Sequence, residues 1–312
     1  GRVVGDGAVR NERRCLEGQP PSVNNGSVVG HGAPVDLEAR VQHARAEPAS
    51  LLAYRSICGF VPGDMLPPTY PHVLATGVHL AMLGSRAFPV RVAGLSHLSN
   101  RIELLEPIPS EASLSLYCTL TGPEETGLGQ EFSLVTTAKR NGRPVWREAM
   151  RFLARSPGQG KRPTRQKNKK KKDHAPDDAE TLACWGAPTA IGRRYAQVSG
   201  DYNPIHLFAS TARFFGFDRA IAHGMWSLAR STASLAPNAG NGPLTVDARF
   251  LKPLLLPGEV ELAVESVAGD ERRFWLSSVG AGPVHLAGTL TCDEPQVRHD
   301  RRSARRAPVG VS

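Results

Sequence analysis

The sequence predicts an α+β protein made of two tandem copies of one unit, in which a helix packs on a run of antiparallel strands. Each half shows an apolar helical pattern followed by segments that alternate apolar and polar residues. A Pro-x-Glu pattern opens an alternating segment at Pro109 and again at Pro257, an offset of 148 residues. The shared order of elements and the fixed offset indicate an internal repeat.

The predicted helices and strands follow from the spacing of apolar residues. Apolar side chains three or four positions apart form one helix face, and strict alternation is the period of a half-buried strand. The helical positions are Leu74, Val78 and Ala81, ending at Gly84, and then Ile221, Met225, Leu228 and Leu235. The alternating positions are Leu114, Leu116 and Cys118, and then Val260, Leu262 and Val264, with hairpin turns expected at Asn141-Gly142 and Ala281-Gly282-Pro283.

The composition is that of an ordinary globular protein. The chain has 312 residues, of which 40% are hydrophobic and 21% charged, enough for two domains with a core each. No apolar run approaches the roughly 20 residues that span a bilayer, so we expect no membrane insertion and a cytoplasmic location. The five scattered cysteines (Cys15, Cys58, Cys118, Cys184 and Cys292) show no metal-ligand spacing and are expected to be free thiols.

The positive charge is concentrated in one segment. Residues 161–172 contain eight Lys or Arg and no acid, against a net charge of +9 for the whole chain. A run of this kind is typical of a solvated linker. The alternative is a basic tether for an acidic carrier protein, nucleotide phosphates or a membrane surface. Because the rest of the chain is nearly neutral, we expect no nucleic-acid binding.

The domain boundaries follow from these patterns. We expect a flexible N-terminal segment at residues 1–45, a first repeat at 46–155 and a basic flexible linker at 156–178. A second repeat at 179–296 and a flexible tail at 297–312 complete the chain.

Chemistry-bearing residues gather in the segment YAQVSGDYNPIHLFAS. Its Gly, Asn and Pro predict a sharply shaped loop that holds Asp201 and His206 five residues apart. Gly224 follows at the predicted start of a helix, where a free backbone N–H and the positive end of the helix dipole face outward. An acid, an imidazole and such an N–H suit chemistry beside a carbonyl. The residues alone leave open the alternative that Asp201 and Asn203 only close turns while His206 is a satisfied buried histidine.

A resemblance to a known family favours the catalytic interpretation. The octapeptide SGDYNPIH, from Ser199 to His206, resembles the signature of the MaoC-like/hydratase 2 family, and the downstream AHGMW resembles a second block of that family. The resemblance implies a double hot-dog fold, with a long central helix wrapped by an antiparallel sheet in each repeat. It also implies (R)-specific hydration of 2-enoyl thioesters, a catalytic pair at Asp201 and His206, an oxyanion-binding amide at Gly224, and no coenzyme or metal.

The first half, from about residue 50 to 155, looks like the degenerate repeat of double hot-dog members. The repeat offset places Ala53 and Cys58 at the positions of Asp201 and His206, so this half has no second catalytic pair. We expect it to complete the sheet and shape the acyl tunnel. His72 and His79 are expected to have core or tunnel-lining roles.

Several further residues are assigned supporting roles. Asn203 and Ser199 are expected to support the loop without touching the substrate. His223 is expected to cap the helix or orient the loop, with thioester contact as the alternative. Substrate contacts are expected from Tyr195, Met225 and Phe214. For the aromatic residues Phe214, Phe215, Phe217 and Trp226, packing in the core is the favoured alternative to lining an acyl pocket.

The sequence therefore predicts a hydro-lyase of fatty-acid metabolism that interconverts (3R)-hydroxyacyl and trans-2-enoyl thioesters. The substrate is an acyl-CoA or an acyl-carrier-protein thioester, one chain is a pseudo-dimer, and a homodimer remains possible. Two rivals stay open. One is a hot-dog thioesterase, and the other is a non-catalytic thioester-binding scaffold subunit.

Overall fold

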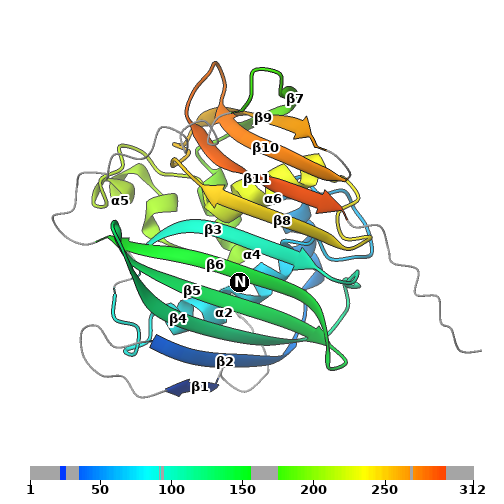
Figure 1. Cartoon of the computed structure of the whole chain (residues 1–312), viewed down its shortest axis with the longest axis vertical. Coiled ribbons are helices and arrows are strands. Elements are labelled where there is room, and N and C mark those ends of the chain that lie inside the picture. The colour runs from blue at the N-terminus through cyan, green and yellow to red at the C-terminus, as the bar shows by residue number, and fades with distance from the viewer. Residues whose placement is uncertain are drawn as a thin grey trace, which may run out of the picture.

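A single twisted antiparallel sheet dominates the structure (Figure 1). The computed structural model describes residues 22–25, 35–90, 92, 95–155, 175–267 and 270–292. Within these residues eleven strands pair in the order β1-β2-β4-β5-β6-β3-β8-β11-β10-β9-β7. Their bounds are β1 (Ser22–Asn25), β2 (Val35–Ala44), β3 (Leu95–Leu104), β4 (Leu114–Thr126), β5 (Gly129–Arg140), β6 (Arg143–Arg155), β7 (Glu180–Ala187), β8 (Leu244–Phe250), β9 (Gly258–Ser266), β10 (Glu271–Ser278) and β11 (Val284–Cys292).

The sheet is internally symmetric about the pair β3 and β8, which joins the two halves of the chain. Read outward from this pair, the first half runs β3, β6, β5, β4, β2 and the second runs β8, β11, β10, β9, β7. In the β3–β8 ladder Asn100 faces Ala248, its own counterpart at the offset of 148 residues. The pseudo-twofold axis therefore passes between these two residues, which confirms the predicted duplication and the continuous sheet.

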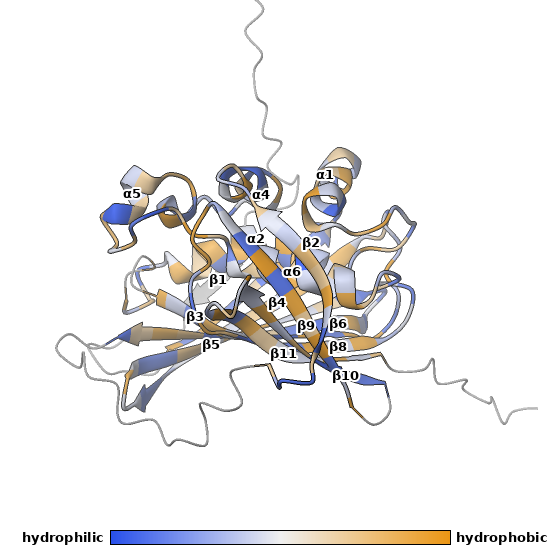
Figure 2. Cartoon of the chain, turned by 90° about the horizontal axis from the view of Figure 1, so that it is seen from above, coloured by the Kyte–Doolittle hydropathy of each residue, from blue (hydrophilic) through white to orange (hydrophobic). Residues whose placement is uncertain are grey.

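Two central helices pack against the concave face of this sheet, and the shorter helices lie above them (Figure 2). Most residues of α2 and α6 are buried, since the sheet covers one side and the other helices cover the rest. This is the predicted α+β arrangement of one central helix for each half-sheet. The helices are α1 (Pro48–Cys58), α2 (Tyr70–Leu83), α4 (Ile191–Ser199), the 3-10 turn η3 (Pro204–His206), α5 (Ala209–Arg213) and α6 (Gly224–Leu235).

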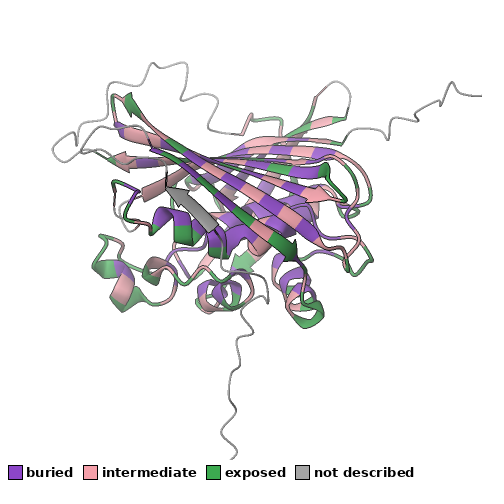
Figure 3. Ribbon diagram, turned by 90° about the horizontal axis from the view of Figure 1, so that it is seen from below, coloured by how far each residue is buried: buried purple, intermediate pink, exposed green. Residues whose placement is uncertain are grey.

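The strands follow the predicted alternation, with buried and more exposed residues in turn along their length (Figure 3). The hairpin between β5 and β6 turns at Asn141 and Gly142, with φ of 51° and 78°. The hairpin between β10 and β11 turns at Gly280 and Ala281, with φ of 78° and 58°. Positive φ at both central residues matches the right-handed twist of the flanking strands.

One boundary prediction is wrong. Strand β2 lies inside the segment predicted to be flexible, residues 1–45, and pairs with β4 from Val35 to Ala44. Its inward residues Val35, Leu37 and Ala39 are buried, so burial of this apolar face holds the strand on the sheet. The first repeat therefore begins ten or so residues earlier than the sequence indicated.

Other sequence predictions fall on parts of the chain outside the described residues. These include most of the basic linker, up to residue 174, and the tail at 297–312. Cys15 also lies outside them, whereas Cys58, Cys118 and Cys184 carry free thiols as predicted. In the described part of the chain, no helix combines the length and the apolar character that crossing a membrane requires.

Candidate active site

The loop that follows α4 has a shape dictated by its own residues. Gly200 ends α4 with φ of 77°, a left-handed conformation that costs glycine little. The chain then turns at Asp201, whose Oδ1 accepts from the backbone N–H of Asn203 at 3.1 Å. The Oδ1 of Asn203 accepts from the N–H of Ile205 at 3.4 Å and so caps η3. Ser199 completes the loop, because its Oγ accepts from the N–H of Asp201 at 3.2 Å.

This local network presents His206 on η3, with its ring buried and stacked on that of His223, the residue before α6. Its Nδ1 lies 2.9 Å from the carbonyl oxygen of Ile221. Because a carbonyl only accepts, Nδ1 carries the proton and Nε2 keeps a lone pair. One carboxylate oxygen of Asp201, one ring nitrogen of His206 and one of His223 lie within 4.8 Å of one another. The predicted acid and imidazole are therefore brought together.

Burial sets the protonation state of His206. Its side chain is removed from solvent, and this desolvation lowers the pKa of the imidazole below its usual value. The Asp201 carboxylate and the hydrogen bond to Ile221 act in the opposite direction without cancelling the effect. At neutral pH the ring is thus an uncharged base.

His223 stacks directly on His206, with ring centroids 3.8 Å apart. Its Nε2–H donates to the backbone carbonyl of Asp201 at 3.0 Å, while its Nδ1 is buried and has no partner among the described residues. Burial, with the neighbouring imidazole, lowers the pKa of His223 to about 3, so this ring stays neutral. The ring ties the loop to the start of α6, and the loop-orienting role of His223 stays a prediction.

Gly224 is the first residue of α6, immediately after His223. The first N–H groups of a helix have no acceptor within the helix, and the N-terminus bears a partial positive charge. The preceding residue His223 gives no side-chain cap to this end. Space is also limited here, because a Cβ at position 224 would lie 2.8 Å from the Phe250 ring. The Gly224 amide is therefore an available donor close to the buried imidazoles.

Of the three predicted substrate contacts, two lie near the imidazole cluster and one does not. Tyr195 is buried with its ring centroid 4.9 Å from that of His223, and Met225 is buried next to Gly224. Phe214 is not brought to this cluster, since it lies at the end of the short helix α5 and is 88% exposed. The expectation of core packing holds for Trp226 but is wrong for Phe214 and Phe215, because α5 has only five residues and lies at the surface.

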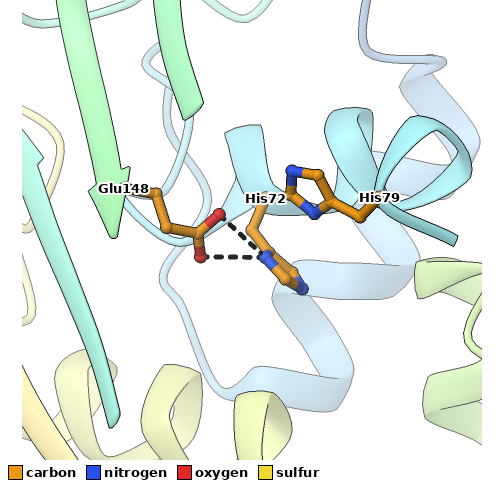
Figure 4. Close-up of side chains that lie close together, drawn as sticks. All are labelled: His72, His79 and Glu148. Carbon is orange, nitrogen blue, oxygen red and sulfur yellow. Dashed lines mark hydrogen bonds and ion pairs between the residues drawn. The ribbon is translucent and has the colours of Figure 1, made fainter. Parts of the chain in front are cut away.

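Sequence reasoning missed a second polar cluster, in the first repeat. The Nδ1–H of His72 on α2 donates a hydrogen bond of 2.9 Å to the carboxylate of Glu148 on β6, 76 residues along the chain (Figure 4). Glu148 is fully buried, and His79 lies beside the pair with its ring centroid 5.5 Å from that of His72. A signal was present, because strand alternation places Glu148 on the same inward side as Trp146 and Met150. Ala53 and Cys58 lie in α1 and offer no acid–base pair.

Both clusters have the donor types of a metal site, two imidazoles and one carboxylate. In the second repeat, one nitrogen of His206 and one of His223 are already used by backbone carbonyls. Each ring therefore has a single nitrogen left for a proton, a water molecule or a ligand.

Comparison with known proteins places this arrangement in a family. A model described as the MaoC like domain matches residues 165–285, which contain the loop and the start of α6. Over 257 residues the chain is 30% identical to 3-hydroxyacyl-thioester dehydratase X of Mycobacterium tuberculosis, covering 80% of this chain and 87% of that protein. A probable enoyl-CoA hydratase 2 of Dictyostelium discoideum is 29% identical over 137 residues, 42% of this chain and 45% of that protein.

A solved structure agrees with the fold. The crystal structure of HtdX of Mycobacterium tuberculosis superposes with a TM-score of 0.69 at 27% identity, covering 81% of this chain and 98% of that one. The hot-dog arrangement predicted from the octapeptide is thereby confirmed. The chain belongs to the MaoC-like hydratase and dehydratase family.

Proposed function

We propose that this protein is an (R)-specific hydro-lyase that interconverts (3R)-hydroxyacyl thioesters and trans-2-enoyl thioesters plus water. The observation that carries the proposal is the hydrogen bond from His206 to Ile221. It leaves a neutral Nε2 as a base on a ring that clusters with the Asp201 carboxyl group and stacks on His223, the residue before the first amide of α6. The names of the relatives, a 3-hydroxyacyl-thioester dehydratase and a probable enoyl-CoA hydratase 2, support this reaction class.

In the hydration direction, Nε2 of His206 takes a proton from water as the water oxygen bonds to the β-carbon. The double-bond electrons move toward the carbonyl, whose oxygen gains negative charge and is held by the Gly224 N–H. The proton taken up by His206 passes through water to the Asp201 carboxylate, and the carboxyl group formed in this way donates it to the α-carbon. One water is consumed, no electrons are gained or lost, and dehydration is the reverse sequence.

The remaining residues support this geometry. Asn203 and Ser199 hold Asp201 through backbone hydrogen bonds, and His223 fixes its carbonyl. The proposed reaction uses neither a coenzyme nor a metal, and CoA or phosphopantetheine enters only as part of the substrate. Tyr195 and Met225 are the proposed substrate contacts beside the reacting carbons. We also propose a place in fatty-acid metabolism and a cytoplasmic location.

A direct assay tests the function. Crotonyl-CoA and longer 2-enoyl-CoAs should lose their enoyl absorbance without release of free thiol, and the product should be the (3R) isomer by chiral analysis. The matching acyl-carrier-protein thioesters are assayed in parallel to identify the preferred carrier. Thiol release with an unchanged double bond would indicate the thioesterase instead. Binding without turnover would indicate the scaffold subunit.

A further inference from the structure

The buried cluster of the first repeat contains a pair of oppositely charged groups that is almost completely removed from solvent. Two hydrogen bonds, 2.9 and 3.1 Å long, join Nδ1 of His72 to the Glu148 carboxylate. A third joins Nδ2 of Asn100 to Oε1 of the same carboxylate at 2.6 Å. The Glu148 side chain is 0% exposed and that of His72 is 12% exposed. Removing such charges from water is costly even when they are paired.

The fold itself does not need these polar groups, as the pseudo-symmetry of the sheet demonstrates. Asn100 has Ala248 as its counterpart across the axis. Glu148 pairs across the strands with Ile102 on β3. In the second repeat Phe250 on β8 is the counterpart of Ile102, because each lies two residues after Asn100 or Ala248. Phe250 pairs with Leu286, which is therefore the counterpart of Glu148. Ala248 and Leu286 are both 0% exposed, so the second repeat fills the same inward positions with apolar side chains.

The cluster is connected to the start of α6. The Nδ2 of Asn100 also lies 3.2 Å from the Sδ of Met225, the residue next to Gly224. On the neighbouring part of β3, the His97 ring packs on Phe250 with centroids 4.5 Å apart. Phe250 in turn lies against Gly224. Polar and aromatic residues of the first repeat therefore contact the helix end that carries the candidate oxyanion donor.

The two side chains of the pair shift each other's pKa in opposite directions. Burial lowers the pKa of His72, but Glu148 and, to a lesser degree, Asp201 raise it, so that it ends above the usual value. Burial raises the pKa of Glu148, and His72 outweighs this effect, so the carboxyl group ends below its usual value. The influence of Asp201 also places His72 within electrostatic reach of the second repeat's loop.

We propose that Asn100 is a positioning residue for the reaction of the second repeat, held by the Glu148–His72 pair and acting through Met225 on the Gly224 amide. The first repeat then does more than complete the sheet, because it holds the oxyanion donor from the opposite side of the pseudo-twofold axis. The inference rests on the proposed function.

The test is a double-mutant cycle with Asn100→Ala, Met225→Leu and the double variant. Each single change should lower kcat by about tenfold, less than the loss of a whole oxyanion donor, with little change in KM. The double variant should be no worse than the poorer single variant, since both remove one interaction. Thr136→Val is the matched control. It removes the hydroxyl that His79 contacts at 2.7 Å, also in this buried region, and should leave kcat unchanged.

A second readout separates positioning from a merely structural role. A saturated acyl-CoA thioester should bind the wild type more tightly than the matching S-alkyl-CoA thioether, which lacks the carbonyl oxygen. Asn100→Ala should reduce this ratio while leaving the thioether affinity unchanged. A structural role would lower the melting temperature and weaken both ligands equally. If Asn100→Ala does not fold, Asn100→Ser, whose side chain is shorter but still polar, gives the same measurement without changing a proposed substrate contact.

Two results would overturn the inference. One is a kcat for Asn100→Ala within twofold of the wild type, and the other is a double variant whose loss equals the product of the two single losses. Failure of the proposed function gives a different result, because the wild type would then lack hydratase activity altogether. An active wild type that is inactivated by Asp201→Asn but not by Asn100→Ala refutes the positioning role alone.

Discussion

The Nδ1–H of His206 donates to the carbonyl of Ile221 across 2.9 Å, linking the loop after α4 to the segment that leads into α6. This single contact sets the tautomer of the imidazole and fixes the loop against the neighbouring helix end. Its consequence is a base whose free nitrogen needs no rearrangement before it meets water.

The pH dependence of activity follows from the lowered pKa of His206. The base works when neutral, that is, above its pKa, and burial moves that pKa below the usual value of 6.5. We expect kcat/KM to stay level as the pH falls from 8 to about 6.5 and to decline only below that. The measurement is a pH profile of crotonyl-CoA hydration, with a stability control at each pH. A decline that begins above pH 7 would contradict the assignment.

Substitution of the acid or the base should remove catalysis without unfolding the protein. Asp201→Asn and His206→Ala should each lower kcat by roughly 10²- to 10⁴-fold, because each removes one proton-transfer group. The melting temperature should stay within a few degrees of the wild type. Asp218→Asn, at an exposed acid on the same stretch of chain, is the matched control and should keep full activity. Two active variants would show that the site is elsewhere.

Gly224→Ala tests the amide at the start of α6. The new Cβ would lie 2.8 Å from the Phe250 ring, so the helix end must shift and carry its N–H away from the substrate oxygen. We expect kcat to fall at least about tenfold. The complete removal of an oxyanion donor costs more, about 10²- to 10³-fold, because a displaced amide keeps part of its effect. Phe250→Leu makes room and should restore part of the rate in the double variant. A double variant as poor as Gly224→Ala would mean that the steric contact is not the cause.

The Glu148–His72 pair should stabilise the fold within a defined pH window. Because the pKa of Glu148 is lowered on folding, this group contributes its full stabilisation above pH 4.5, the usual glutamate pKa. That stabilisation is lost as the pH falls through the pKa of the folded state. Because the pKa of His72 is raised on folding, this group contributes its full stabilisation below pH 6.5, the usual histidine pKa. That stabilisation is lost as the pH rises through the pKa of the folded state. The free energy of unfolding should therefore differ most between wild type and Glu148→Gln from pH 4.5 to 6.5.

The expected size of that difference is about 3 kcal/mol, the cost of breaking a buried pair. Denaturant titrations at several pH values measure it. Glu103→Gln serves as the control, because Glu103 pairs with Arg101 in a partly exposed ion pair. Surface pairs of this kind contribute under about 1 kcal/mol. A Glu148→Gln effect that does not change with pH would mean that the pair is not charged.

Removal of metal ions should leave the activity unchanged. The proposed reaction uses only a base, an acid and a backbone amide, so dialysis against a chelator should preserve kcat. The check is the crotonyl-CoA assay before and after dialysis, with the metal content measured on the same samples. Loss of activity that zinc restores would instead assign a metal to Asp201, His206 and His223, whose donor atoms lie within 4.8 Å of one another.

The sequence by itself determined the features that depend on neighbours in the chain. The alternation of apolar residues predicted the strands, and the offset of 148 residues predicted the internal repeat, which the structure shows as a sheet symmetric about Asn100 and Ala248. The loop from Ser199 to His206 was equally accessible, because Gly200, Asn203 and their hydrogen bonds act over two or three residues. Its resemblance to a family signature then indicated the chemistry, which the residues alone had left open.

Only the tertiary structure decided the contacts between distant segments. Nothing local pairs Glu148 with His72, or Asn100 with Met225, since these depend on the register of β6 on β3 and on how α6 packs over the axis. The same holds for the strand at Val35–Ala44, which burial against β4 holds in place, and for Phe214, which the short helix α5 leaves in solvent. Local patterns specify which face of an element is apolar, whereas packing decides which groups meet on it.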